Sequence, residues 1–241
     1  RRRLAKPLII AHRGFHRKVR ENTREAILAA RDVGADGVEF DVRTTADGVH
    51  VLHHNRTRLI RGRQRPLSML PRSALPAWVP NFETILRRME RWTGFLVDVE
   101  LKDPQVPADV LRLLRAIPRK RLIVTSFHRS VCRLMTKTLP GVPVGWLRER
   151  PTARDASTAR RDGCRMIIVH RRDLKQNIAK ATKRHRLELW TWGINSVRRA
   201  RAAVALGVRG IITDRPDLLL HADLTRSARP KTSRRKGRRG N

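Results

Sequence analysis

The segment Gly37-Val38-Glu39-Phe40-Asp41-Val42-Arg43 combines the hydrophobic pattern of a buried β-strand with two acidic residues. Glu39 and Asp41 are two positions apart, and alternate side chains of a strand point to the same face. Carboxylates that lie among valine and phenylalanine are costly to bury without a partner. A divalent cation shared by the two groups would supply that partner.

Two other hydrophobic segments end in charged residues in the same way: Ile9-Ile10-Ala11-His12-Arg13-Gly14 and Val97-Asp98-Val99-Glu100-Leu101-Lys102. Each begins as a strand and places acids, bases or a histidine where the strand is expected to end. Glu100 and Lys102 again have the two-residue spacing that puts both side chains on one face.

Strand-like segments alternate with segments of helical periodicity along most of the chain. An added antiparallel strand is expected over Val49–His54, after the tight-turn signal Asp47-Gly48. The main strands are expected to begin at Leu8, Gly37, Phe95, Arg121, Val142, Arg165, Leu187 and Val208. Eight β/α units in about 220 residues favour a single (β/α)8 TIM barrel. The alternative is an open doubly wound sheet, which usually has fewer strands, and no Gly-rich dinucleotide turn is present.

The chain of 241 residues is strongly basic, with 55 Lys and Arg, 21 Asp and Glu, and a formal net charge of +34. We expect a basic N-terminal lead over residues 1–7, the barrel over 8–221 and a basic disordered tail over 222–241. The tail contributes +7, which leaves +27 for the rest. Such a field attracts phosphates on nucleic acid, anionic membranes or small phosphodiesters without choosing among them. A solvated surface that serves solubility would explain the charge equally well.

The cysteine pattern indicates a reducing compartment. Cys132 and Cys164 have no CxxC spacing, so neither a disulfide framework nor a zinc site is expected. No run approaches the ~20 apolar residues of a membrane span. We therefore expect a cytoplasmic protein. The chain starts at Arg1 without a methionine, so a removed targeting segment, and with it a secreted or membrane-surface location, stays open.

In a barrel the carboxyl ends of the strands meet at one mouth, which would bring the charged residues together. Glu39, Asp41 and Glu100 offer only oxygen ligands, and such sites suit Mg²⁺ or Ca²⁺. Arg13 has the planar fork that matches a phosphate edge, and Lys102 adds a point charge. The histidines His12 and His53-His54 can exchange protons near neutral pH.

The spaced motifs of this chain resemble those of the glycerophosphodiester phosphodiesterase family. The resemblance spans roughly residues 8–220, and several motifs in the right order are far more specific than one. The matching motifs are Ala11-His12-Arg13-Gly14, Glu21-Asn22-Thr23, Gly34-Ala35-Asp36-Gly37-Val38-Glu39-Phe40-Asp41-Val42, Thr45-Ala46-Asp47-Gly48, His54-Asn55, Glu100-Leu101-Lys102, Trp192-Gly193-Ile194-Asn195 and Gly210-Ile211-Ile212-Thr213-Asp214-Arg215-Pro216.

The resemblance implies a metal-dependent phosphodiesterase that releases glycerol phosphate and an alcohol from deacylated phospholipids. It implies that His12 and His54 are the general acid and base, and that Glu39, Asp41 and Glu100 bind one divalent cation, Ca²⁺ or Mg²⁺. It further implies that Arg13 and Lys102 bind the phosphate and that Trp192 contacts the glycerol or alcohol group. Water or the neighbouring glycerol hydroxyl would be the nucleophile, and the sequence does not distinguish them.

The chain departs from the family pattern at three places. Asn55 follows His54 where the family has aspartate, so a hydrogen bond would be kept without its charge. Arg20 replaces a proline. The segment Arg56–Pro80 is arginine-rich and shorter than the family's usual insertion over the mouth, which predicts a more open site. His54, and not His53, is taken as the catalytic residue from the motif, since only one of the two can face inward.

Other residues are assigned structural roles. Asp214-Arg215-Pro216-Asp217 is interpreted as a helix cap and structural pair, and His170 as a solvated strand end. Trp78, Trp92 and Trp146 are interpreted as core or rim packing.

Two rival functions stay open. One is a phospholipase D-like enzyme that acts on intact lipids at anionic membranes. The other is a non-catalytic barrel that binds anions or nucleic acid, although no aromatic stripe for base stacking is present. Nothing in the sequence indicates an obligate protein partner.

Overall fold

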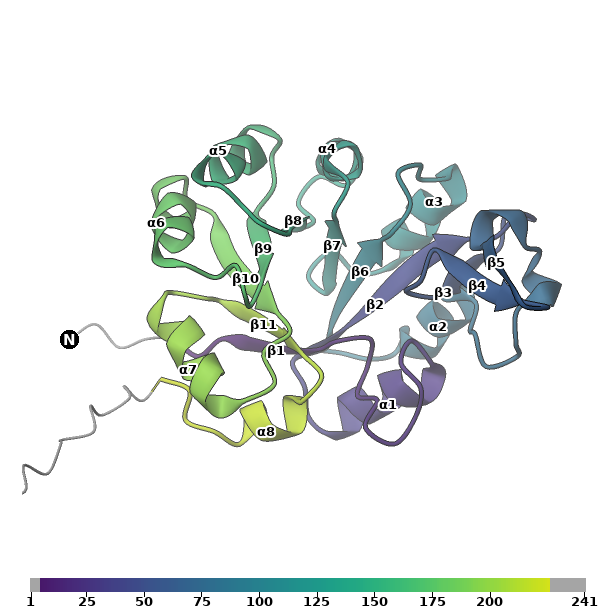
Figure 1. The fold of residues 1–241 in the computed structure, drawn as a ribbon, viewed down its shortest axis with the longest axis horizontal. Helices are drawn as coiled ribbons and strands as arrows, with labels where there is room; N and C mark the ends of the chain where they lie inside the picture. Colours follow the sequence, from purple (N-terminus) through teal and green to yellow (C-terminus); the bar gives the residue numbers. More distant parts are fainter. Residues whose placement is uncertain (1–4, 226–241) are drawn as a thin grey trace, which may run out of the picture.

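The computed structural model describes residues 5–225, and eight parallel strands in it close into a barrel (Figure 1). Each strand pairs with the next one around the barrel, and the second and the last strand both pair with the first. The barrel strands are β1 (Leu8–Ala11), β2 (Gly37–Thr44), β6 (Leu96–Leu101), β7 (Leu122–Ser126), β8 (Val144–Arg148), β9 (Met166–His170), β10 (Glu188–Trp192) and β11 (Gly210–Thr213). The predicted (β/α)8 TIM barrel is confirmed.

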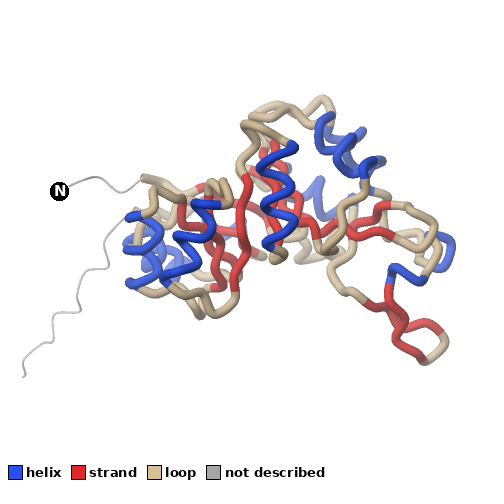
Figure 2. Tube along the Cα trace, turned by 90° about the horizontal axis from the view of Figure 1, so that it is seen from above, coloured by secondary structure: helices blue, strands red, loops and turns tan. Residues whose placement is uncertain are grey.

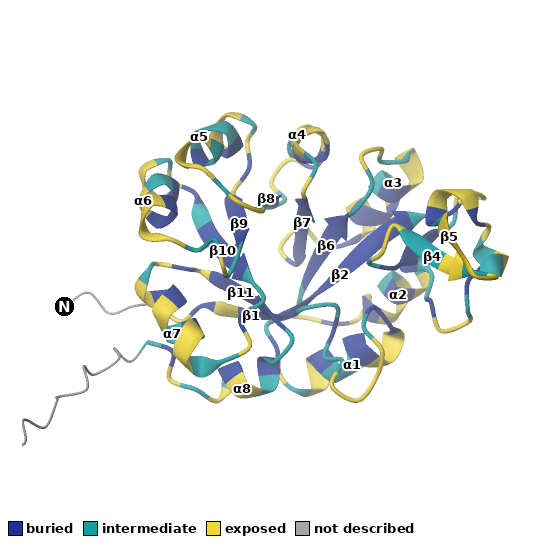
Figure 3. Ribbon diagram, in the orientation of Figure 1, coloured by how far each residue is buried: buried dark blue, intermediate teal, exposed yellow. Residues whose placement is uncertain are grey.

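Helices surround the barrel and bury one face each against it. Figure 3 shows buried strands at the centre and helices whose outer faces are exposed. The helices are α1 (Arg24–Asp32), α2 (Phe82–Met89), α3 (Ala108–Ala116), α4 (Arg129–Thr138), α5 (Ala153–Arg161), α6 (Gln176–Arg184), α7 (Val197–Ala205) and α8 (Pro216–Leu220). Thr23 caps α1 by accepting a hydrogen bond from the Ala26 N–H, which satisfies a donor of the first turn.

Buried side chains fill the barrel interior. Its cluster consists of Ile10, Ile123, Leu147, Met166, Ile168, Trp190 and Ile212. Trp190 is 1% exposed and lies directly against the backbone of Gly210. A Cβ at that position would be 2.2 Å from the indole ring, so only glycine fits. The residues two positions beyond this layer on each strand face the carboxyl-end mouth.

Residues 45–81, here called the excursion, connect β2 to α2 and stand beside the mouth. The excursion holds β3 (His50–Leu52), β4 (Thr57–Ile60), β5 (Arg63–Pro66) and the 3₁₀ helices η1 (Leu67–Met69) and η2 (Arg72–Ala74). β3 pairs antiparallel with β2, which confirms the added strand over part of the expected range. The sequence does not predict the β4–β5 hairpin, because this arginine-rich segment lacks hydrophobic alternation. Figure 2 shows it projecting from one edge of the molecule.

The described part of the expected tail belongs to the folded body. Leu224 is 2% exposed and packs in the cluster that contains Ile9 and Leu219. The body therefore extends past residue 221, and residues 226–241 of the expected tail, like residues 1–4 of the lead, lie outside the described residues. Within residues 5–225, no helix has the length and hydropathy needed to cross a bilayer.

Candidate active site

A cavity of about 160 Å³ lies at the carboxyl ends of the strands, where the sequence predicts the site. The sequence-predicted site residues that line it are His12, Arg13, Glu39, His54, Glu100, Lys102 and Trp192. Asp41, the remaining one, is fully buried beside Glu39 and Glu100. The structure thus brings all of the predicted residues to one place.

Three carboxylates from two neighbouring strands meet at the base of this cavity. Glu39, Asp41 and Glu100 each offer an oxygen, and these oxygens lie within 4.8 Å of one another. The pairing of β2 with β6 sets this spacing, because Asp41 is the register partner of Glu100. Glu39 Oε1 and Asp41 Oδ1 are buried and make no hydrogen bond. Three clustered carboxylates, two of which have an unbonded buried oxygen, fit a hard divalent cation.

Without a cation, the carboxylates of the cluster oppose one another's ionisation. Burial, followed by the charge of Asp41, raises the pKa of Glu39 well above its usual range. Burial and Asp41 also raise the pKa of Glu100 to about 7. Asp98, the register partner of Glu39, is fully buried, and burial raises its pKa to about 8 although Thr125 donates a hydrogen bond to it. The site therefore disfavours negative charge unless positive charge is nearby.

Lys102 and Arg13 supply positive charge at the cluster. Lys102 Nζ is 2.6 Å from Glu100 Oε1 and 3.3 Å from Asp41 Oδ1, and Arg13 Nε is 3.3 Å from Asp41 Oδ2. Burial raises the pKa of Asp41, but these two cations outweigh it and hold that pKa below its usual value. Burial lowers the pKa of Lys102, and the carboxylates Glu100 and Asp41 more than offset that effect.

The Glu21-Asn22 pair holds two of the site residues in place, a role that the sequence argument did not assign. Asn22 donates to Asp41 Oδ2 at 2.8 Å and accepts from the Asp41 N–H at 3.1 Å. Glu21 accepts two hydrogen bonds from Arg13 Nη1, at 2.9 and 3.0 Å. The Arg13 N–H in turn donates to Glu39 Oε2 at 2.9 Å. The loop between β1 and α1 thus orients both the cluster and the guanidinium.

His12 is oriented by a chain of hydrogen bonds from residues that follow the last two barrel strands. Its Nδ1 lies 2.7 Å from Asp214 Oδ1, and its Nε2 is 4.0 Å from Glu39 Oε2. Asn195 Nδ2 donates to Asp214 Oδ2 at 2.7 Å. Burial raises the pKa of Asp214, but the hydrogen bonds from His12 and Asn195 outweigh it and lower that pKa to about 2. Asp214 is therefore ionised and fixes the ring with Nε2 facing the cluster.

This contact corrects the interpretation of Asp214 as a helix cap. The residue at the N-cap of α8 is Arg215, which pairs with Asp217. Asp214 bonds His12 instead, over a separation of 202 residues. The signal that could have found it is its position directly after β11, since carboxyl ends of barrel strands carry functional residues.

His54 faces the cavity and His53 does not. His54 Nδ1 is 3.0 Å from Asn55 Oδ1, so a neutral amide stands where His12 has a carboxylate. His53 is 8% exposed and lies 3.0 Å from the Asn55 carbonyl oxygen. Burial lowers the pKa of His54, and the cations Arg13 and Lys102 add to this against the charge of Asp41. The imidazole of His54 is therefore neutral at neutral pH.

Aromatic side chains form the opposite wall of the cavity. Trp192 packs edge-on against Phe127, with ring centroids 5.7 Å apart, and also contacts His170. Trp92 and Trp146 are each 6% exposed, which confirms their assignment to packing. Trp78 is 38% exposed at the rim, where the guanidiniums of Arg20 and Arg58 lie near its ring.

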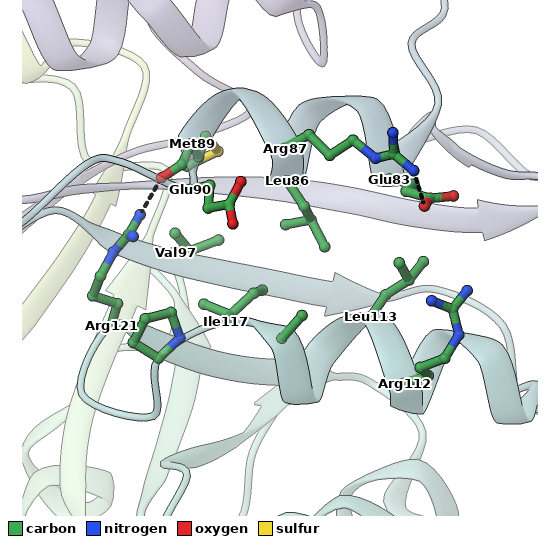
Figure 4. Close-up of a pocket in the computed structure, with 12 residues that line it drawn as sticks. Glu83, Leu86, Arg87, Met89, Glu90, Val97, Arg112, Leu113, Ile117 and Arg121 are labelled. Atoms are coloured by element: carbon green, nitrogen blue, oxygen red, sulfur yellow. Dashed lines mark hydrogen bonds and ion pairs between the residues drawn. The ribbon is translucent and has the colours of Figure 1, made fainter.

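A second cavity, of about 410 Å³, lies on the outside of the barrel between α2 and α3 (Figure 4). Leu86, Met89, Leu113 and Ile117 line it, and Glu83 and Arg87 form an ion pair at its edge. Val97 and Arg121 place it near the amino ends of β6 and β7. It is therefore remote from the strand ends that carry the charged cluster.

Replacing Asp214 with asparagine is expected to lower kcat for turnover at this site by about 10²-fold, with a smaller change in KM. The asparagine amide has the shape of the carboxylate but not its negative charge. It therefore no longer holds the proton on Nδ1 of His12, and the ring loses its fixed tautomer. The measurement is steady-state kinetics across pH, where the profile should also shift. Asp217→Asn is the control, because Asp217 forms its ion pair with Arg215 and not with a histidine. Equal losses in both variants would contradict a positioning role for Asp214.

Comparison with known proteins agrees with this geometry. The model of the glycerophosphoryl diester phosphodiesterase family matches residues 12–218. A glycerophosphodiester phosphodiesterase of Caldanaerobacter subterraneus is 28% identical over 236 residues, which cover 90% of this chain and 97% of the relative. The crystal structure of a glycerophosphodiester phosphodiesterase from Agrobacterium tumefaciens has a TM-score of 0.70 and 26% identity, and covers 88% of this chain and 98% of its own.

An Oleispira antarctica phosphodiesterase, solved in complex with the product sn-glycerol-3-phosphate, shares the fold with a TM-score of 0.75 and 20% identity. The match covers 88% of this chain and 94% of that one. The matched region begins at His12, directly after β1, and ends within α8, so it spans the barrel. On the fold, the ordered motifs and this match, the chain belongs to the glycerophosphoryl diester phosphodiesterase family.

Proposed function

We propose that this protein is a metal-dependent phosphodiesterase that hydrolyses glycerophosphodiesters to glycerol 3-phosphate and an alcohol. The observation that carries the proposal is the single cavity that joins two histidines, a carboxylate cluster and two cations. Family membership and the product complex of the Oleispira phosphodiesterase support the same substrate class.

The roles of the residues follow from charge and position. Glu39, Asp41 and Glu100 would hold one cation, and their oxygen-only donor set favours Mg²⁺ or Ca²⁺. When bound, the cation neutralises phosphate charge and polarises an oxygen for attack. Arg13 and Lys102 bind the phosphoryl oxygens and stabilise the charge that develops on them.

The two histidines carry the proton transfers. His54 is neutral at neutral pH, and so it accepts a proton from the nucleophile. His12, held by Asp214, presents Nε2 to the same cavity and delivers a proton to the leaving alcohol. The phosphoester bond to the alcohol breaks as the new oxygen–phosphorus bond forms.

The test is release of glycerol 3-phosphate from glycerophosphocholine and glycerophosphoethanolamine, with Ca²⁺, with Mg²⁺ and with chelator. Turnover that requires a divalent cation is expected. An intact, folded protein that turns over neither substrate with either cation would overturn the proposal.

A second candidate, action on intact lipid at a membrane surface, is favoured by the excursion. The excursion contains six arginines and a single acidic residue, Asp47. Leu59 is 61% exposed and Met69 is 69% exposed among these arginines, and Trp78 stands between Arg20 and Arg58. Exposed apolar side chains within a basic surface match the boundary of an anionic bilayer.

Co-sedimentation with phosphatidylserine and phosphatidylcholine vesicles tests this candidate, together with assays on lysophospholipid and phospholipid. Binding to the anionic vesicles, lost on Leu59→Ser with Met69→Ser, and turnover of the lipids would support it. Binding to nucleic acid that needs neither apolar residue, without turnover of any ester, would favour the non-catalytic alternative.

A further inference from the structure

The mouth of the barrel is divided into two halves with different chemistry. The carboxylate cluster, its cations and His12 come from the ends of β1, β2 and β6, with Asp214 following β11. The ends of β7, β8 and β10 instead contribute Phe127, Glu149 and Trp192 to the same cavity. A substrate whose phosphate lies in the first half would extend one of its two ester arms over the second.

Strand alternation explains why these three residues face the mouth. Ile123, Leu147 and Trp190 belong to the interior cluster of the barrel. Glu149 lies two residues after Leu147, and Trp192 lies two residues after Trp190, so each repeats the inward direction one layer higher. Phe127 continues the inward series of Ile123 on β7 in the same way.

Glu149 is unusual because it is an unpaired acid in a chain of net charge +34. Among residues 5–225 it makes no hydrogen bond and no ion pair, although most acidic side chains there have a partner. Its electrostatic neighbour is His170, whose pKa is lowered by burial and by Arg172 and Arg171 more than Glu149 and Asp173 raise it. His170 therefore stays neutral at neutral pH and forms no ion pair with Glu149.

The aromatic side chains beside Glu149 present surfaces that attract cations. Lys102 Nζ already lies 5.5 Å from the ring centre of Phe127, on the side of the carboxylate cluster. Trp192 stands perpendicular to Phe127 at 5.7 Å and is partly exposed to the cavity. An indole next to a carboxylate is a favourable environment for an ammonium group.

We propose that Glu149, Trp192 and Phe127 form a subsite for the positively charged alcohol of the substrate, an ammonium-bearing group such as choline or ethanolamine. This inference rests on the proposed phosphodiesterase function and adds a substrate preference to it. A zwitterionic diester, with a negative phosphate and a positive head group, matches a mouth that offers Arg13 and Lys102 to the phosphate at one side and carries an unpaired acid at the other.

The competing role for Glu149 is to accept hydrogen bonds from the glycerol hydroxyls. The two roles predict different dependences on the head group. A subsite for a cation affects only substrates with a charged alcohol, whereas contact with glycerol affects every glycerophosphodiester equally.

The experiment compares kcat/KM for glycerophosphocholine and glycerophosphoethanolamine with that for glycerophosphoglycerol, whose alcohol is neutral. The wild-type protein is expected to prefer the cationic substrates by about tenfold, and Glu149→Gln to remove most of that preference. Turnover of glycerophosphoglycerol should change by less than about twofold. The preference should also weaken with added salt, because the carboxylate is exposed.

Glu90→Gln is the matched control, because Glu90 is also an exposed acid without an ion pair among the described residues but lies between α2 and α3. It should leave the preference unchanged. Equal losses on all three substrates in Glu149→Gln, or no loss, would overturn the subsite.

Binding measurements separate this inference from the proposed function. Calorimetric titration of choline and of its neutral analogue, with carbon in place of the ammonium nitrogen, needs no turnover. Tighter binding of choline to wild type, lost in Glu149→Gln, supports the subsite even if no diester is hydrolysed. Equal binding of the two analogues to wild type overturns it even if the protein is an active phosphodiesterase.

Discussion

Replacing His12 with alanine is expected to lower kcat/KM for glycerophosphodiester hydrolysis by about 10²–10⁴-fold. Its Nε2 faces the cavity while Nδ1 is held by Asp214, and no other histidine that lines the cavity has a carboxylate partner. The leaving alcohol would then depart without a proton donor. Steady-state kinetics with saturating cation measures the effect.

His16→Ala is the matched control for this substitution. His16 Nε2 lies 4.0 Å from the same Asp214 oxygen but does not line the cavity. It should retain most of the activity. If His12→Ala unfolds at the wild-type temperature and remains as active as His16→Ala, His12 has no role in proton transfer.

The Glu39→Gln substitution is expected to abolish cation binding and to lower turnover by about 10³-fold, while making the cation-free protein more stable. Glu39 is 2% exposed, and its Oε1 has no hydrogen-bond partner. The neutral amide retains an oxygen for the Arg13 N–H and removes one charge from the crowded cluster. The free energy of unfolding in chelator should rise by about 1–3 kcal/mol at about pH 8.

The sign of the pH dependence follows from the raised pKa values. The folded state raises the pKa of Glu39 well above its usual range and that of Glu100 to about 7, so it holds these protons more tightly than the unfolded chain. Stability of the cation-free protein is therefore lost as pH rises from the unfolded pKa towards the folded one. The advantage of Glu39→Gln should be larger at about pH 8 than at about pH 5.

Thermal unfolding with chelator, Mg²⁺ and Ca²⁺ measures both effects. The wild-type protein should gain several degrees in Tm from the cation, and Glu39→Gln should gain none. Asp98→Asn separates repulsion from ligation, since Asp98 is buried beside Glu39 but is not one of the three clustered ligands. A lower Tm of Glu39→Gln than of wild type in chelator would contradict the proposed repulsion.

Much of the architecture was predictable because it depends on short-range patterns. Strand and helix periodicity predicted the barrel strands to within about two residues at most ends, and the motifs predicted which residues meet at the mouth. The β4–β5 hairpin escaped prediction because Arg56, Arg58, Arg61, Arg63 and Arg65 hide the two-residue period. Its turn at Arg61-Gly62, with φ values of 47° and 74°, is the local feature that specifies it.

The amino-acid sequence by itself determined the fold, the carboxylate cluster and the meeting of His12 and His54 at the mouth, because two-residue spacing fixes the face of a strand and parallel strands share their carboxyl ends. Only the tertiary structure decided which partner each group has. Asp214 reaches His12, and Asn22 reaches Asp41, through closure of the barrel and the path of one loop. The unpaired state of Glu149 likewise depends on what surrounds it in space, which no local pattern records.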